Sequence, residues 1–362
     1  MSRSAFRRIA LALGVLLALA LVASGCGGGG GGGTKIAYLL PENETPRYEA
    51  HDRPEFEENV EELCEDCEIL YNNATEDASK QQSQAEAALT QGAEVLVLDP
   101  VDAASAAAIV EKAKAQGVPV LSYDRLIENA DVDYYVSFDN ERVGKLQAES
   151  LSKKLKEDGS PSGPIVMISG DPADSNAALF KKGAQEGFES SGVDVAKEYD
   201  TPEWSATNAQ NEMQQAITAL GKGGFNGVYA ANDDTGGGAI AAMRSAGIEP
   251  AEKPTTGQDA TVAGVQRILA GQQYMTVYKA TDKETKVAAE IAVALAEGKS
   301  FPRSKITDEP NNGKAKVPSV LLEPVAVTKD SIKQTVVADE FITPDELCTS
   351  AYEKACKEAG IS

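Results

Sequence analysis

Two adjacent residues of opposite charge, Asp124 and Arg125, follow a short apolar run in the segment VPVLSYDRLI, residues 118–127. Charges are excluded from the middle of a buried strand, whereas side chains at its carboxyl end face the crevice above a parallel sheet. An aspartate accepts hydrogen bonds and an arginine donates several in a fixed fork, so the pair can hold a group that does both, such as a sugar hydroxyl. In the alternative interpretation, Asp124 caps a helix and Arg125 is a solvated surface charge.

Other polar residues end apolar runs in the same way. Asn232, Asp259 and Lys279 each follow a run of strand type, and we predict that they line the same crevice. Asp99 and Asp234 also follow such runs, but we interpret these two as N-caps of the helices that come next.

Two aromatic residues complete the set of candidates. Tyr48 follows Arg47 in the polar loop after the first strand, and Trp204, the only tryptophan, lies in the loop 201–204. Flat aromatic rings cover the C–H face of sugar rings while polar groups bind the hydroxyls. Trp204 could equally pack over its own loop, and the residues alone favour neither interpretation.

Short apolar strands alternate with helical stretches from Lys35 onward. The first series has strands at 35–40, 68–71, 94–98 and 118–121 and helices at 55–63, 76–90 and 103–115. After a helix at 141–156 and a polar loop, a second series has strands at 165–169, 193–199, 227–231 and 255–257 and helices at 176–190, 206–220 and 236–245. This alternation predicts an α/β fold with two similar parallel-sheet lobes, each sheet covered on both faces.

The amino terminus has the pattern of an export signal. Three arginines precede an apolar stretch, residues 9–23, which is too short for a comfortable membrane span. Ala23-Ser24-Gly25-Cys26 resembles a bacterial lipobox, which predicts lipidation at Cys26, but Ala23 stands where that pattern has Leu, so ordinary secretion is the alternative. A glycine run at 27–33 forms a tether. We therefore expect an exported protein anchored on the outer face of the cytoplasmic membrane. The net charge of −22 argues against nucleic acid as a partner.

The four remaining cysteines are disulfide candidates because an exported protein meets an oxidising environment. The acidic residues around Cys64 and Cys67 disfavour a reactive thiolate, so a structural bridge is favoured over a redox centre. Cys348 and Cys356 can pair only if a helix begins after Cys348, because a continuous helix would separate them by about 12 Å. A metal site is not expected, since the chain has a single histidine.

The sequence resembles the sugar-binding proteins of bacterial ABC transporters, which have the type I periplasmic binding protein fold. The resemblance covers residues 35–341 and rests on VLSYDRLI, DVDYYVSFDNERVGKLQ, SNAALF, ANDDTGGGAI, TGQDA, MTVYKATD and VPSVLLEPVAVTKDSIKQTVV, which come in order and at the spacing of the family. It implies two lobes that close around a monosaccharide, such as the aldopentose xylose, and a membrane permease as partner. It implies no cofactor and a monomer.

The resemblance also implies a set of ligand-binding residues. They are Arg47, Tyr48 (in place of a tryptophan), Asp124, Arg125, Asn176, Trp204, Asn232, Asp259 and Lys279. The first loop differs in length from the family pattern at residues 49–51, and the segment 64–67 and the tail from Thr343 depart from it.

The three-crossing hinge of the family places the chain's parts as follows. Residues 1–25 are a signal peptide, 26–33 the lipidated cysteine and tether, 34–139 with 280–323 the N-terminal lobe, and 140–279 with 324–362 the C-terminal lobe.

Three other functions would make different demands on the same residues. A glycosidase could use Asp124 and Asp259 as its two carboxylates, but Arg125 and Lys279 would keep both ionised and leave no proton donor. A module that senses a sugar for a membrane kinase remains open. Dinucleotide binding is excluded, because no predicted strand is followed by G-x-G-x-x-G.

Overall fold

The computed structural model describes residues 33–361. The first lobe is built on a six-stranded parallel sheet with strand order β10-β5-β4-β3-β1-β2. Its strands are β1 (Lys35–Leu40), β2 (Glu68–Asn73), β3 (Val95–Leu98), β4 (Val120–Tyr123), β5 (Tyr134–Phe138) and β10 (Ser319–Leu322). All residues of β3 and β4 are buried, as expected for strands that are covered on both faces.

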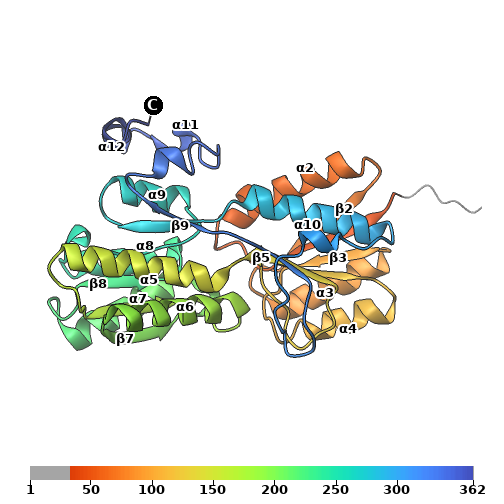
Figure 1. Cartoon of the computed structure of the whole chain (residues 1–362), viewed down its shortest axis with the longest axis horizontal. Helices are drawn as coiled ribbons and strands as arrows, with labels where there is room; N and C mark the ends of the chain where they lie inside the picture. Colours follow the sequence, from red (N-terminus) through yellow and green to blue (C-terminus); the bar gives the residue numbers. More distant parts are fainter. Residues whose placement is uncertain (1–32, 362) are drawn as a thin grey trace, which may run out of the picture. The chain divides into compact units, whose positions relative to one another are not determined.

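Four helices cover this sheet. One face packs against α2 (Arg53–Leu63) and α10 (Thr281–Ala296), and the other face packs against α3 (Ala78–Thr90) and α4 (Ala107–Ala115) (Figure 1). The helix α10 lies far along the chain from the other three, so the lobe is completed only after the chain has passed through the second lobe.

The second lobe has a three-stranded parallel sheet in the order β7-β6-β8. Its strands are β6 (Ile165–Ser169), β7 (Val195–Asp200) and β8 (Gly227–Ala230). Its helices are α5 (Asn140–Glu157) and α6 (Ser175–Ser191), which share one apolar core with the sheet, and α7 (Ala206–Leu220) and α8 (Asp233–Ser245), which share another. The predicted α/β architecture with parallel sheets in two lobes is confirmed.

Two glycines allow α5 and α6 to pack with their backbones in contact. A Cβ at Gly144 would collide with the carbonyl of Phe180, and a Cβ at Gly183 would collide with the carbonyl of Glu141. This close packing brings the amino-terminal turn of α6, which carries Asn176, against the end of the first lobe.

The chain passes between the lobes three times, after β5, after β9 (Met275–Tyr278) and after β10. The strand β9 pairs antiparallel with β11 (Val325–Thr328), and both pack with the second lobe. The residue boundaries of the lobes given above stay a prediction.

Some element boundaries differ from those expected. The helix predicted at 103–115 begins only at Ala107, and the strand predicted at 255–257 is reduced to a single bridge between Val228 and Thr255. The sequence analysis named no element at 134–138 or 281–296, where β5 and α10 lie. Short elements such as β5, with five residues, carry weak periodic signals, so packing decides their limits.

The four cysteines named as disulfide candidates form two bridges. Cys64 pairs with Cys67, and Cys348 pairs with Cys356. The second bridge forms because α11 (Pro344–Leu347) ends at Cys348 and α12 begins at Glu353 (Glu353–Glu358), which is the interruption that pairing required.

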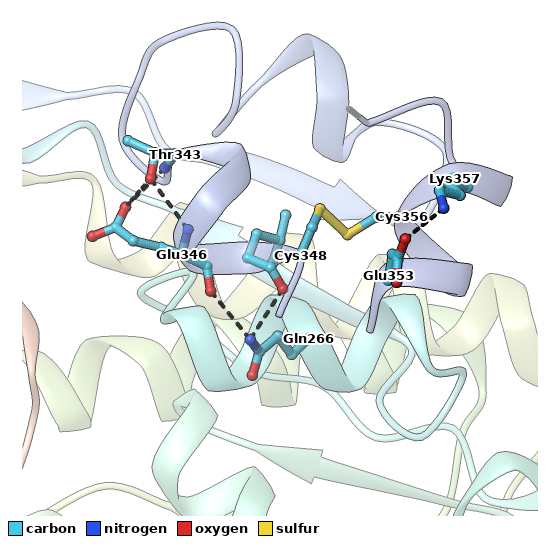
Figure 2. The surroundings of a disulfide bond; sticks show 8 residues. Gln266, Thr343, Glu346, Cys348, Glu353, Cys356 and Lys357 are labelled. Carbon is cyan, nitrogen blue, oxygen red and sulfur yellow. Dashed lines mark hydrogen bonds and ion pairs between the residues drawn. A yellow bond between two sulfur atoms is a disulfide. The ribbon is translucent and has the colours of Figure 1, made fainter. Parts of the chain in front are cut away.

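The disulfide-closed tail packs against α9 (Val262–Leu269). Gln266 on α9 donates its side-chain amide to the carbonyl of Leu347 at 3.1 Å and to that of Glu346 at 3.4 Å (Figure 2). Below them, Leu347 and Cys356 join an apolar core with Ile268 and Leu269. The tail is therefore an integral part of the second lobe.

Within residues 33–361, none of the helices has both the length and the apolar character required to traverse a membrane. Cys26 lies outside the described residues, so the predicted lipidation site has no structural description.

Candidate functional site

The first side of the site is organised by Arg47. This residue precedes a single turn of π-helix (Tyr48–Asp52), whose hydrogen bonds span five residues instead of four. The turn lies where the first loop departs in length from the family pattern. Arg47 donates from Nε to Asp52 at 2.9 Å and from Nη2 to Glu284 of α10 at 3.0 Å, and its Nη1 lies 3.4 Å from Asp124.

Asp124 follows β4 in a left-handed backbone conformation, with φ of 52°. The Tyr48 hydroxyl donates to its carboxylate at 3.1 Å, and the Asn176 side-chain amide donates to its carbonyl at 2.9 Å. Non-glycine residues with positive φ concentrate at functional sites, and Trp204 and Asp259 share this property, with φ of 50° and 84°. No helix begins at Asp124, so the capping interpretation is wrong.

Arg125 is only 2% exposed and lies among three acids. Its Nε is 3.1 Å from Asp174 and 3.6 Å from Asp99, and its Nη2 is 3.8 Å from Glu42. The prediction that Asp99 is an N-cap is also wrong, because Asp99 is fully buried beside this guanidinium and the next helix begins after Ala106.

The second side of the site consists mainly of neutral groups. Asn232 is the N-cap of α8 and forms a capping box with Thr235, so Asp234, the predicted cap, lies inside the first turn instead. Lys279 directly follows β9 and forms an ion pair of 2.9 Å with Asp259. The two ions come from different strand ends and neutralise each other.

Trp204 packs edge-on against Phe180 and lies directly over Gly170, where a Cβ would collide with the indole ring. Its Nε1 donates to Asp174 at 3.2 Å. The ring therefore has neighbours within its own lobe, and it also borders the space between the lobes.

All the predicted ligand-binding residues line one cavity between the lobes. These are Arg47, Tyr48, Asp124, Arg125, Asn176, Trp204, Asn232, Asp259 and Lys279. The cavity is also lined by residues that the sequence analysis did not select: Thr45, Asp174, Phe180 and Gln258. Gln258 and Asp174 could have been found from their positions, because each lies within two residues of a selected residue.

The cavity is small, about 20 Å³, which is room for little more than one water molecule. Several of its polar groups are paired with one another across it. Within residues 33–361, Arg47 Nη1 and Gln258 Oε1 are buried and make no hydrogen bond, so the cavity offers both an unused donor and an unused acceptor.

The electrostatics of the site keep Asp124, one of the two carboxylates of the glycosidase alternative, ionised. Burial alone would raise the pKa of Asp124, but the charges of Arg47, Lys279 and Arg125 outweigh it and hold that pKa below its ordinary value. Burial also raises the pKa of Asp99, Glu284 and Asp174, and of these three only Asp174 lines the cavity, where the charge of Arg125 at 3.1 Å opposes the effect of burial. A carboxylate that stays ionised cannot serve as the general acid of a glycosidase.

The described part of the chain contains no cluster of three or more His, Cys, Asp or Glu side chains arranged to hold a metal ion.

Residues 36–300 match the family model described as a periplasmic binding protein domain. The chain belongs to this family. It is a solute-binding protein of the kind that serves sugar ABC transporters, and it is a transport receptor, not an enzyme.

Known proteins of this family are similar to the chain over most of its length. The D-xylose-binding periplasmic protein of Haemophilus influenzae is 39% identical and covers 77% of this chain and 82% of its own. The D-xylose-binding periplasmic protein of Escherichia coli is 38% identical and covers 82% of this chain and 87% of its own. A solved ABC transporter solute-binding protein from Clostridium phytofermentans with bound β-D-glucose is 28% identical, with a TM-score of 0.78, and covers 87% of this chain and 100% of its own.

Proposed function

We propose that this protein captures one monosaccharide, an aldopentose such as D-xylose, between its two lobes and delivers it to the permease of an ABC importer. The observation that carries the proposal is the convergence of the nine predicted residues, from widely separated segments, on one cavity. Charged donors and acceptors, neutral amides and an aromatic ring are what a ring of hydroxyl groups requires.

The small size of the cavity supports a mechanism in which the lobes part to admit the sugar. Tyr48 donates to Asp124, and Arg125 Nη2 donates to the Tyr48 hydroxyl at 3.4 Å. These contacts satisfy the side chains until ligand hydroxyls take their place. A hydroxyl that is buried without a partner costs about 1–3 kcal/mol, which discriminates between sugars that differ at one carbon.

Xylose as the ligand is supported by two relatives named for it, at 39% and 38% identity. Other relatives are named for different solutes, among them the multiple sugar-binding periplasmic receptor ChvE of Rhizobium radiobacter, which is 33% identical. Because the relatives are named for different sugars, the identity of the bound sugar has to be measured directly.

The test is a thermal-shift panel of aldopentoses and aldohexoses on residues 34–362, which form one compact unit. A sugar at about 100 times its Kd should add about 2.7 kcal/mol to the free energy of unfolding. Calorimetry then ranks the sugars that respond, and NMR checks that an aryl xyloside stays intact at stoichiometric protein. A panel in which no monosaccharide shifts the midpoint would show that the proposed function is wrong.

We further propose that Cys26 carries the lipid that anchors the protein. Its support is the lipobox Ala23-Ser24-Gly25-Cys26 after a short apolar stretch. In cells fed labelled palmitate, the wild type should incorporate label and Cys26→Ala should not. Equal labelling of the two proteins would exclude this residue.

A further inference from the structure

A second hollow, which we call the side groove, lies next to the polar cavity. It is walled by Pro46, Ala50 and His51 from the first lobe and by Val262, Ala263 and Phe341 from the second. Its volume is about 320 Å³, far larger than that of the polar cavity. The larger of these two spaces is therefore the apolar one and is not the one that the charged residues enclose.

The side groove and the polar cavity share a border. Arg47 and Asp259 line both of them, one from each lobe. A molecule whose polar part occupies the cavity can thus extend into the groove past these two side chains. Ala50 and Ala263 on the groove walls are exposed, so the groove also opens to solvent.

The far wall of the groove is held in place by the tail. The Phe341 ring stacks on His51 with centroids 4.1 Å apart and packs against Tyr278 at 4.9 Å. A few residues after Phe341, Gln266 binds the carbonyls of Glu346 and Leu347, and the disulfide-closed segment begins next, at Cys348 (Figure 2). Gln266 itself lines the groove. Because the wall is tied to α9 in this way, the groove does not depend on a loose terminus.

Asp234 places a polar atom without a hydrogen-bond partner at the groove. Asp234 Oδ2 is buried and makes no hydrogen bond within residues 33–361, although Asp234 is one of the groove's lining residues. Burial, and then the charge of Asp233, raise its pKa to about 7. A carboxyl group of this kind can donate or accept a hydrogen bond to an ether or hydroxyl oxygen of a ligand.

We propose that the side groove holds the apolar aglycone of a small glycoside whose sugar ring occupies the polar cavity, so that alkyl and aryl glycosides are ligands in addition to the free sugar. An apolar cavity of about 150 Å³ is enough to bind benzene, so the groove has room for a single aromatic ring. The proposal rests on the proposed function, because the sugar ring must first be bound.

The test is calorimetry with D-xylose, or with the sugar that binds best in the panel, and with its methyl and phenyl glycosides in both anomeric forms. For one anomer, the phenyl glycoside should bind at least about tenfold more tightly than the methyl glycoside, since burying an aromatic ring contributes more than 1.4 kcal/mol. Ala50→Trp and Ala263→Trp, which fill the groove, should abolish this difference and leave the affinity for the free sugar within about threefold.

The matched control is Ala270→Trp, because Ala270 is exposed at the end of α9 and does not line the groove. This variant should keep the preference for the phenyl glycoside.

If the free sugar binds but neither phenyl glycoside binds as well as its methyl counterpart, the groove proposal is overturned and the proposed function stands. The same holds if the filling variants weaken every ligand equally. If no free sugar binds, the proposed function fails and the groove proposal fails with it.

Discussion

The two sides of the polar cavity solve the problem of buried polar groups in opposite ways. On the first side, Arg47 lies within 4 Å of three carboxylates of its own lobe, and Arg125 lies within 4 Å of Glu42 and Asp99 of its own lobe and of Asp174 from the second. On the second side, the polar groups are mostly amides, Asn232 is already used as a helix cap, and a single ion pair joins Lys279 to Asp259. Loss of one arginine would therefore leave more buried carboxylates without a partner than loss of Lys279 would.

This difference indicates at which residues a substitution can change ligand affinity without a large change in folding stability. A buried arginine surrounded by acids is part of the folding of its lobe, because its removal leaves several charges without a partner. A side chain that pairs with one acid, or that caps a helix, can be changed with a smaller effect on folding. The predictions below test this contrast, beginning with the largest expected effect.

The largest effect is expected for Arg47→Met. Asp52 and Glu284 would remain buried without their shared cation, so the free energy of unfolding should fall by about 3–5 kcal/mol. Lys279→Met, the matched change on the second side, leaves only Asp259 unpaired and should lower it by about 1–3 kcal/mol. Urea unfolding measures both, and equal losses would contradict the contrast between the two sides.

A large loss of affinity is expected for Asp124→Ala. The variant removes a charged acceptor at the centre of the cavity, and hydrogen bonds to charged groups contribute about 1.5–3 kcal/mol. Sugar affinity measured by calorimetry should therefore fall at least tenfold. Asp131→Ala, at an exposed position outside the cavity, serves as the control. A folded Asp124→Ala protein that binds as tightly as the wild type would remove Asp124 from the ligand site.

A moderate effect is expected for Trp204 on the second side. Since it is the only tryptophan, its emission reports on this side alone, and it should shift and saturate as sugar is added. Trp204→Ala should weaken binding by a few kcal/mol at most, and Trp204→Phe should restore part of that loss. If the emission ignores a sugar that binds by calorimetry, Trp204 packs only its own loop and does not contact the ligand.

The last prediction is a pH dependence of stability from Asp234. Its pKa is about 7 in the folded state and near 4 when unfolded. Between these values the unfolded chain has released its proton and the folded chain has not, so this group lowers stability as the pH rises from about 4 to 7. Asp234→Asn should therefore flatten the fall of the melting temperature between pH 5 and 7. An unchanged slope would show that other carboxyls dominate it.

Part of the site could be predicted because the carboxyl ends of parallel strands meet at one edge of a sheet. Once the runs before Asp124, Asn232 and Asp259 are recognised as strand ends, their convergence follows. Helix capping was harder to predict, because Asn232, Asp233 and Asp234 are all good caps. Which one becomes the cap depends on where the backbone leaves β8.

The sequence by itself determined the fold class, the family and the types of residue that face the cavity, since these depend on local pattern and on strand ends. It also favoured a structural bridge at Cys64 and Cys67 over a redox centre. Only the tertiary structure decided that Arg47 shares its charge with Glu284, which lies 237 residues away, and that Phe341 closes a groove beside the site. Those contacts depend on how the two lobes, the tail and the π-helical turn at Tyr48–Asp52 pack against one another. No local pattern in the chain encodes distances between segments so far apart in the sequence.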